Sequence, residues 1–71
     1  MDRGMWEQHL AIAERHLAEA RQHVVRQRQV IFEFRRDAHN TTRAQALLAT
    51  FKATLKLHVE DRDRLKAELS R

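Results

Sequence analysis

The sequence predicts an all-α protein, an antiparallel two-helix hairpin whose helices carry heptad seams and pair with a second hairpin in a four-helix bundle. Three observations lead to this fold class. Proline is absent and Gly4 is the only glycine, so residues that break helices are missing from almost the whole chain. Apolar residues recur alternately four and three positions apart along two long segments, which is the spacing of a helix–helix seam. One short polar stretch separates these segments, and the 71 residues leave room for a single domain.

The first helix is predicted over about residues 5–38, with residues 1–4 frayed. Ala, Leu, Glu, Gln and Arg, which all favour helix, dominate this segment. One edge of the segment carries the first seam, in which Gln27 is the only polar member. The seam consists of Trp6, Leu10, Ala13, Leu17, Ala20, Val24, Gln27, Ile31, Phe34 and Ala38.

The turn is predicted at about residues 39–41 and the second helix over about residues 42–69. Asp, Asn and Thr gather around the turn, and their side chains readily bond to nearby backbone and start helices. The second seam has the same spacing, with His58 and Arg62 as its polar members. It consists of Ala44, Leu48, Phe51, Leu55, His58, Arg62, Leu65 and Leu69. Two seams joined by a short turn predict an antiparallel hairpin that occupies residues 1–71 as one domain.

Histidine recurs every seven residues beside the first seam, at His9, His16 and His23. If the chain folds at the turn, this flank runs along the corresponding flank of the second helix. His9 then faces Glu68, and His16 faces Asp61. We therefore expect a half-buried flank in which histidines pair with carboxylates across the seam.

A metal site is the alternative interpretation of these histidines. Residues seven apart on a helix are separated by about 10 Å along its axis, which is too far for them to share one ion. The one candidate set crosses the hairpin and consists of His16, His58 and Asp61. Histidines beside an acid are more often a hydrogen-bonded pair, so we expect no metal and no other cofactor.

No pattern in the sequence indicates catalysis. The chain has no cysteine, no serine in a strained turn beside a histidine, and no glycine-rich loop that could hold a phosphate. Two packed helices also offer no concave pocket for a substrate. We therefore do not expect an enzyme.

The expected location follows from what the chain lacks. No apolar run exceeds four residues, as in residues 46–49, so neither a membrane span nor a signal peptide is expected. Without cysteine there is no disulfide pattern to indicate secretion. A cytoplasmic protein is the expectation.

The part of the chain nearest the turn is strongly basic. Residues 21–56 carry a net charge of +6, whereas the whole chain carries +4, so the remaining residues sum to −2. Arg21, Arg28 and Arg35 repeat every seven residues and form one stripe, which could follow a phosphate backbone or an anionic membrane surface. Binding of nucleic acid or of an anionic surface is therefore the alternative function. The candidate contacts are Arg21, Arg28, Arg35, Arg36, Arg43 and Lys52.

The first helix carries a second apolar row outside the seam, which we call the outer row. One partner helix cannot cover both, and apolar surface left in water forfeits about 25 cal/mol per Å². An antiparallel dimer would lay each basic half beside the partner's mildly acidic half. We therefore expect a homodimer, with a tetramer as the next choice, and an interface made by the outer row. The outer row consists of Ala11, Ala18, Val25 and Phe32.

These patterns favour a structural or protein-interaction module that self-associates through helix packing. A second copy of the chain is the first expected partner, and another helical protein is the second. Nucleic acid belongs to the alternative function described above.

Three blocks of the sequence, HLAIAERHLAEARQHVVRQRQ, ALLATF and LHVEDRDRL, resemble those of a family of short, uncharacterised bacterial proteins. The resemblance covers nearly the whole chain from Met5 onward and implies a helical hairpin. Members of that family often carry glycine near the turn, where this chain has Ala38. The resemblance implies no activity, cofactor or site residue, so it supports the fold and adds nothing to the function.

Overall fold

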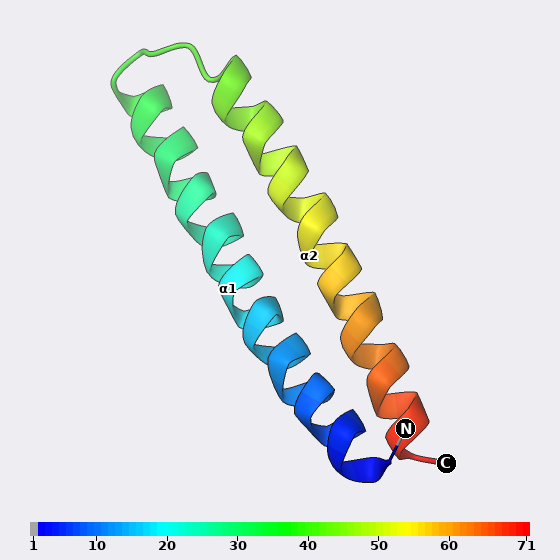
Figure 1. Cartoon of the computed structure of the whole chain (residues 1–71). Helices are drawn as coiled ribbons and strands as arrows, with labels where there is room; N and C mark the ends of the chain where they lie inside the picture. Colours follow the sequence, from blue (N-terminus) through cyan, green and yellow to red (C-terminus); the bar gives the residue numbers. More distant parts are fainter. Residues whose placement is uncertain (1) are drawn as a thin grey trace.

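The computed structural model of the chain describes residues 2–71, which form two α-helices. Helix α1 spans Arg3–Arg36, and helix α2 spans Thr42–Leu69. The helices lie side by side and run in opposite directions, so both termini lie at one end and the turn at the other (Figure 1). The molecule is a rod of 54 × 14 × 14 Å. The predicted hairpin is confirmed, while the predicted fraying of Met1 falls outside the described residues.

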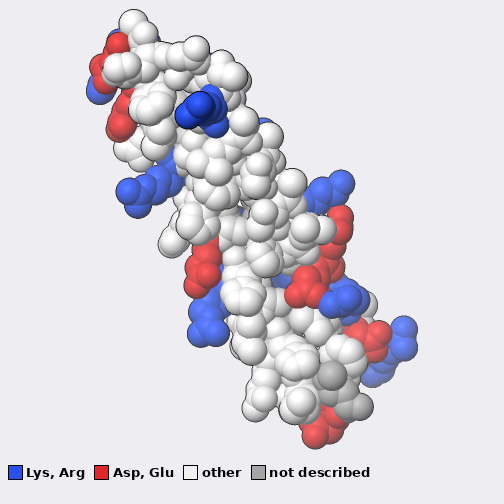
Figure 2. Space-filling view, turned by 45° about the horizontal axis from the view of Figure 1, so that its top comes forward, with Lys and Arg blue, Asp and Glu red and all other residues white. Residues whose placement is uncertain are grey.

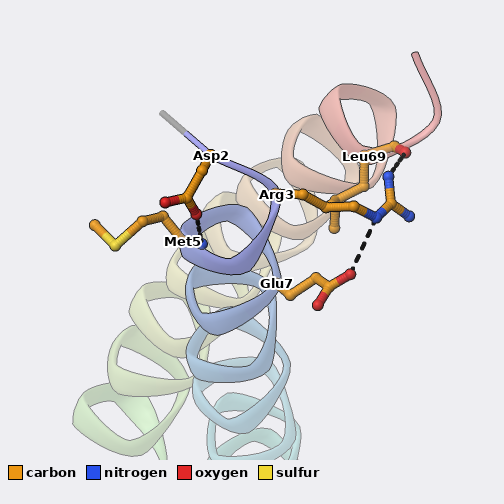
Figure 3. A network of polar contacts seen from close by, with 5 residues as sticks. All are labelled: Asp2, Arg3, Met5, Glu7 and Leu69. Atoms are coloured by element: carbon orange, nitrogen blue, oxygen red, sulfur yellow. Dashed lines mark hydrogen bonds and ion pairs between the residues drawn. The ribbon is translucent and has the colours of Figure 1, made fainter.

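Helix α1 begins at Arg3, two residues before the predicted start, because Asp2 caps it. The Asp2 carboxylate accepts a hydrogen bond of 2.8 Å from the backbone N–H of Met5, which satisfies a free donor of the first turn (Figure 3). The Arg3 guanidinium donates to the carbonyl of Leu69 at the end of α2 over 3.1 Å. The same guanidinium pairs with Glu7 at 3.1 Å. The bond to Leu69 joins the two ends of the hairpin, and a cation suits the carbonyl end of α2.

Helix α1 ends at Arg36, two residues before the predicted end, in a turn centred on Ala38. The N–H of Ala38 donates to the carbonyl of Arg35 over 3.2 Å, and the N–H of His39 donates to the carbonyl of Phe34 over 2.8 Å. This pair of bonds is the Schellman termination of a helix, which places Ala38 at a φ of 59°. The rings of Phe34 and His39 meet edge to face at 5.6 Å and cover the turn. An alanine thus occupies a left-handed position that favours glycine.

Helix α2 begins at Thr42 and ends at Leu69, as predicted. Ahead of it, the side-chain carbonyl of Asn40 accepts a hydrogen bond of 2.8 Å from the N–H of Thr42. The Gln45 amide donates to the Thr41 hydroxyl over 3.0 Å. The polar residues of the turn therefore start the second helix by bonding to its first residues, which is why they interrupt the apolar pattern.

The core lies along the two predicted seams. Leu65 is buried, but the other large apolar seam residues of α2 are only half buried, because a single facing helix cannot enclose them: Leu48, Phe51, Leu55 and Leu69. At the turn the prediction fails: Phe34 is 38% exposed and Ala38 lies outside the helix, so the first seam ends at Ile31. The buried residues are Ala13, Leu17, Ala20, Val24, Gln27 and Ile31 of α1 and Ala44 and Leu65 of α2.

Among residues 2–71, Gln27 is the one buried polar residue, with 8% of its surface exposed. Its amide nitrogen donates to the backbone carbonyl of Ala44 over 2.8 Å. A buried polar group in a seam is stable only where its partner lies opposite, so this bond fixes how far one helix can slide along the other.

Candidate interaction surface

The seam is bordered by two flanks of different chemistry. We call the side of α1 that carries His9, His16 and His23, with the edge of α2 facing it, the histidine flank. The arginine flank is the opposite side, which carries Glu7, Glu14, Arg21, Arg28 and Arg35 of α1. Residues seven apart share one side of a helix, so each flank runs the length of the rod.

Two rings of the histidine flank pack against α2. The His23 ring stacks on Phe51 with a centroid separation of 5.2 Å and an interplanar angle of 23°. The rings of His16 and His58 meet at 5.6 Å in a tilted arrangement. These contacts place His16 and His23 beside the seam. The expected half-buried flank is wrong, however, because His9, His16 and His23 are all exposed.

The expected pairing of His9 and His16 with carboxylates does not form. Asp61 pairs instead with Arg64, and Glu68 pairs with Arg71 at 3.6 Å. Both arginines lie three residues further along the same chain, which puts them within reach of the acid without any contact across the hairpin. Within residues 2–71 no histidine takes part in an ion pair.

The candidate metal set is brought together only in part. His16 and His58 are neighbours, and His16 and Asp61 line one shallow groove. The Asp61 carboxylate, however, is taken by Arg64. Over the described part of the chain, no three histidine, aspartate or glutamate side chains are close enough to hold an ion.

The arginine flank contains a groove with an apolar floor and a cationic rim. Arg28 and Arg35 rise from α1 and Lys52 from α2, so three like charges surround a space of about 470 Å³. None of the three has an ion-pair partner among residues 2–71. The floor is formed by Ile31, Phe32, Leu48 and Ala49. Such a groove suits an apolar side chain accompanied by carboxylates.

The six candidate cations do not form one continuous patch. Arg28, Arg35 and Lys52 share the groove, whereas Arg21 lies beside Val25 against a separate hollow on the outside of α1. Arg36 pairs with Asp37 at 3.2 Å, and Arg43 lies in the first turn of α2. Figure 2 shows that most charged side chains, of both signs, lie along the edges of the visible face, and that one basic side chain interrupts the uncharged strip between them near its upper end.

The outer row is exposed along its whole length. Val25 and Phe32 have 66% and 67% of their surfaces in contact with water, and Phe32 also lines the groove of the arginine flank. Ala11 and Ala18 continue the row toward the chain ends.

Leu57 and Ile12 are exposed apolar residues that belong to neither predicted seam and not to the outer row. Leu57 is 65% exposed, and Ile12 is also exposed. Each follows a seam leucine by two residues, and that spacing was the available signal for a residue on the outside of its helix.

Neither α1 nor α2 contains an apolar stretch long enough to cross a membrane. Comparison with known proteins adds no assignment: no family model matches the chain, and no curated protein or solved structure matches it. The resemblance to short bacterial hairpin proteins therefore stays a prediction.

Proposed function

We propose that the chain is a protein-interaction module that associates with a second copy of itself through helix packing and forms a four-helix bundle. The observation that supports this most directly is the exposure of Val25 and Phe32, which are 66% and 67% exposed on a regular helix. Large apolar side chains held at fixed positions lose little conformational entropy when a partner covers them, so most of their burial favours association.

The surface area of the hairpin supports the same proposal. One chain exposes 5605 Å², whereas a compact protein of 8.5 kDa exposes about 4,700 Å² by the usual scaling with mass. The excess is about 900 Å², and a standard protein interface buries about 800 Å² on each partner. A second hairpin laid along the rod would bring its exposed area close to that of an ordinary small protein.

Within this proposal, a dimer is the first stoichiometry and a tetramer the second. A different helical protein is the competing partner, because the same apolar row and cationic groove would accept an amphipathic helix with acidic edges. The role is structural, with no reaction assigned to the chain. A cytoplasmic location stays part of the proposal.

Sedimentation equilibrium at micromolar concentration tests the proposal. We expect a mass twice the 8.5 kDa of one chain and a melting temperature that rises with protein concentration, because association stabilises the folded state by mass action. A well-folded species of single-chain mass, whose melting temperature does not change with concentration, would refute it. A mass of four chains would support self-association and replace the dimer by a tetramer.

Binding of nucleic acid is the second candidate function, and the groove of the arginine flank is the observation that favours it. Arg28, Arg35 and Lys52 converge without ion-pair partners in residues 2–71, and phosphates would neutralise them. Titration of a generic duplex at rising salt tests this function, which requires a steep linear fall of log affinity with log salt. Arg28→Gln should weaken that binding more than Arg36→Gln, since Arg36 is already paired with Asp37. Absence of measurable binding at low salt would exclude it.

A further inference from the structure

The charges along the arginine flank of α1 change sign at its middle. Acids lie toward the chain ends, and arginines lie toward the turn. The side chains of the outer row become larger in the same direction, from two alanines to a valine and then a phenylalanine. In order, the charged row is Glu7, Glu14, Arg21, Arg28 and Arg35, and the outer row is Ala11, Ala18, Val25 and Phe32.

If a second α1 lies antiparallel to the first, the acidic end of each helix faces the basic end of the other. With Arg21 at the centre, Glu14 of each chain faces Arg28 of the other, and Glu7 faces Arg35. Each dimer contains every one of these contacts twice, because a two-fold interface repeats its contacts. The only like charges that meet within this row are the two central arginines.

The outer row leads to the same alignment independently. When Ala11 lies opposite Phe32, Ala18 lies opposite Val25, so a small residue always receives a large one. The centre of this pairing falls half a residue beyond Arg21, which is a shift of about 0.75 Å along a helix. Charge and side-chain size therefore select one and the same register.

We infer that two hairpins associate antiparallel through the outer faces of their α1 helices, in the register that places Glu14 against Arg28 and Ala11 against Phe32. This inference rests on the proposed self-association and adds its orientation, register and contact residues. The partner copy supplies what one hairpin lacks, because Arg28 and Arg35 border a groove that contains no acid. Glu14 likewise has no ion-pair partner among the described residues.

Helix α2 contributes less to this contact. Val59 is the residue of α2 that lies at the level of Arg21. If the two α2 helices are also antiparallel and centred there, Lys56 of one chain faces Asp63 of the other, which is an attractive pair. Lys52 would face Lys66, a repulsive one. A parallel arrangement is worse for the whole molecule, because it sets the two basic halves, each with a charge of +6, beside each other.

Exchange of the paired charges tests the register. Glu14→Arg places two arginines at each contact, and Arg28→Glu places two acids there, so each variant alone should dimerise at least about tenfold more weakly than the parent. An equimolar mixture of the two variants should form a heterodimer, because opposite charges then meet at both contacts. The doubly substituted chain Glu14→Arg/Arg28→Glu should dimerise like the parent. Sedimentation equilibrium gives the affinities, native mass spectrometry gives the heterodimer fraction, and circular dichroism checks that each variant is helical.

Glu19→Arg and Arg26→Glu are the matched controls, since they make the same charge changes on exposed α1 residues outside the arginine flank and the outer row. In a mixture of these two controls, half of the dimers should be heterodimers, as random pairing predicts.

Dimers of Glu14→Arg and Arg28→Glu that form as tightly as the parent and mix statistically would overturn the register while leaving self-association intact. A selective heterodimer from the control pair would place the interface on the histidine side. A monomeric parent would remove the proposed function and this inference together, and duplex binding that is lost in Arg28→Glu would then assign the groove to nucleic acid.

Discussion

The two flanks border the same seam, but only the side chains of the histidine flank find favourable contacts within a single hairpin. On the histidine flank His23 stacks on Phe51 and His16 meets His58, so rings of both helices cover each other. On the arginine flank Arg28 lies across the groove from Lys52, and like charges cannot cover each other in this way. Aromatic rings from two helices can pack against each other within one hairpin, whereas a cluster of cations requires anions from elsewhere.

Exposure alone does not distinguish the flanks. Phe32 on the arginine side is 67% exposed, and Leu57 on the outside of α2 is 65% exposed. The two residues differ in their surroundings: Phe32 lines the cationic groove, whereas Leu57 lies beside the paired Asp61 and Arg64. They therefore form a matched pair for testing which flank binds a partner.

The largest expected effect comes from shortening these two side chains. Phe32→Ala should weaken the dimer about 30-fold, because each dimer loses two buried aromatic rings, at about 1 kcal/mol for each ring. Leu57→Ala should leave the dissociation constant within about twofold. Sedimentation equilibrium on both variants measures the difference. An equal loss of dimer affinity in both variants, or a greater loss for Leu57→Ala, would show that the partner does not bind at the arginine side.

A smaller effect is expected when the size pairing of the outer row is inverted. Ala11→Phe alone sets two phenylalanines against each other and should weaken the dimer about tenfold through overpacking. Adding Phe32→Ala to that chain restores one small and one large residue at each contact and should recover most of the affinity. The same centrifugation measures this recovery. A double variant as weak as the sum of its single changes would mean that Ala11 and Phe32 do not meet.

The histidine flank should affect folding and leave association unchanged. His23→Ala removes the ring that stacks on Phe51 at 5.2 Å and should lower the free energy of unfolding by about 0.5–1 kcal/mol. Urea denaturation at a fixed chain concentration measures this loss, because the stability of an associating protein depends on concentration. The dimer dissociation constant should stay within about twofold of the parent. If His23→Ala abolished dimerisation instead, the histidine flank would be part of the interface.

The smallest expected effect is a gain of stability at the turn, away from both flanks. Ala38 has a φ of 59°, where an alanine costs about 1–2 kcal/mol and glycine does not. Ala38→Gly should stabilise the hairpin by about 0.5 kcal/mol, since the freer unfolded chain offsets part of the gain. Thermal unfolding at matched concentration reports the change. A lower melting temperature would indicate that the turn of the folded chain does not hold this left-handed conformation.

Much of the fold could be predicted because each helix needs only local information. The alternating spacing of apolar residues located both seams, and the cluster of Asn and Thr at the turn correctly placed the start of α2. The limits of α1 were missed by two residues at each end. Those ends depend on single contacts, the bond of Asp2 to Met5 and the bonds around Ala38, which the apolar spacing does not encode.

The sequence by itself determined the two helices, the seams, the placement of histidines and arginines on separate flanks, and the exposed outer row, because all of these follow from the helical repeat and the composition of each row. The tertiary structure decided the partners of the polar groups. Asp61 and Glu68 pair with arginines of their own segment and leave the histidines to pack as rings, and Gln27 finds the carbonyl of Ala44. These pairings depend on which donor and acceptor lie within about 3 Å of each other in the folded chain. A repeat of seven residues does not fix such distances.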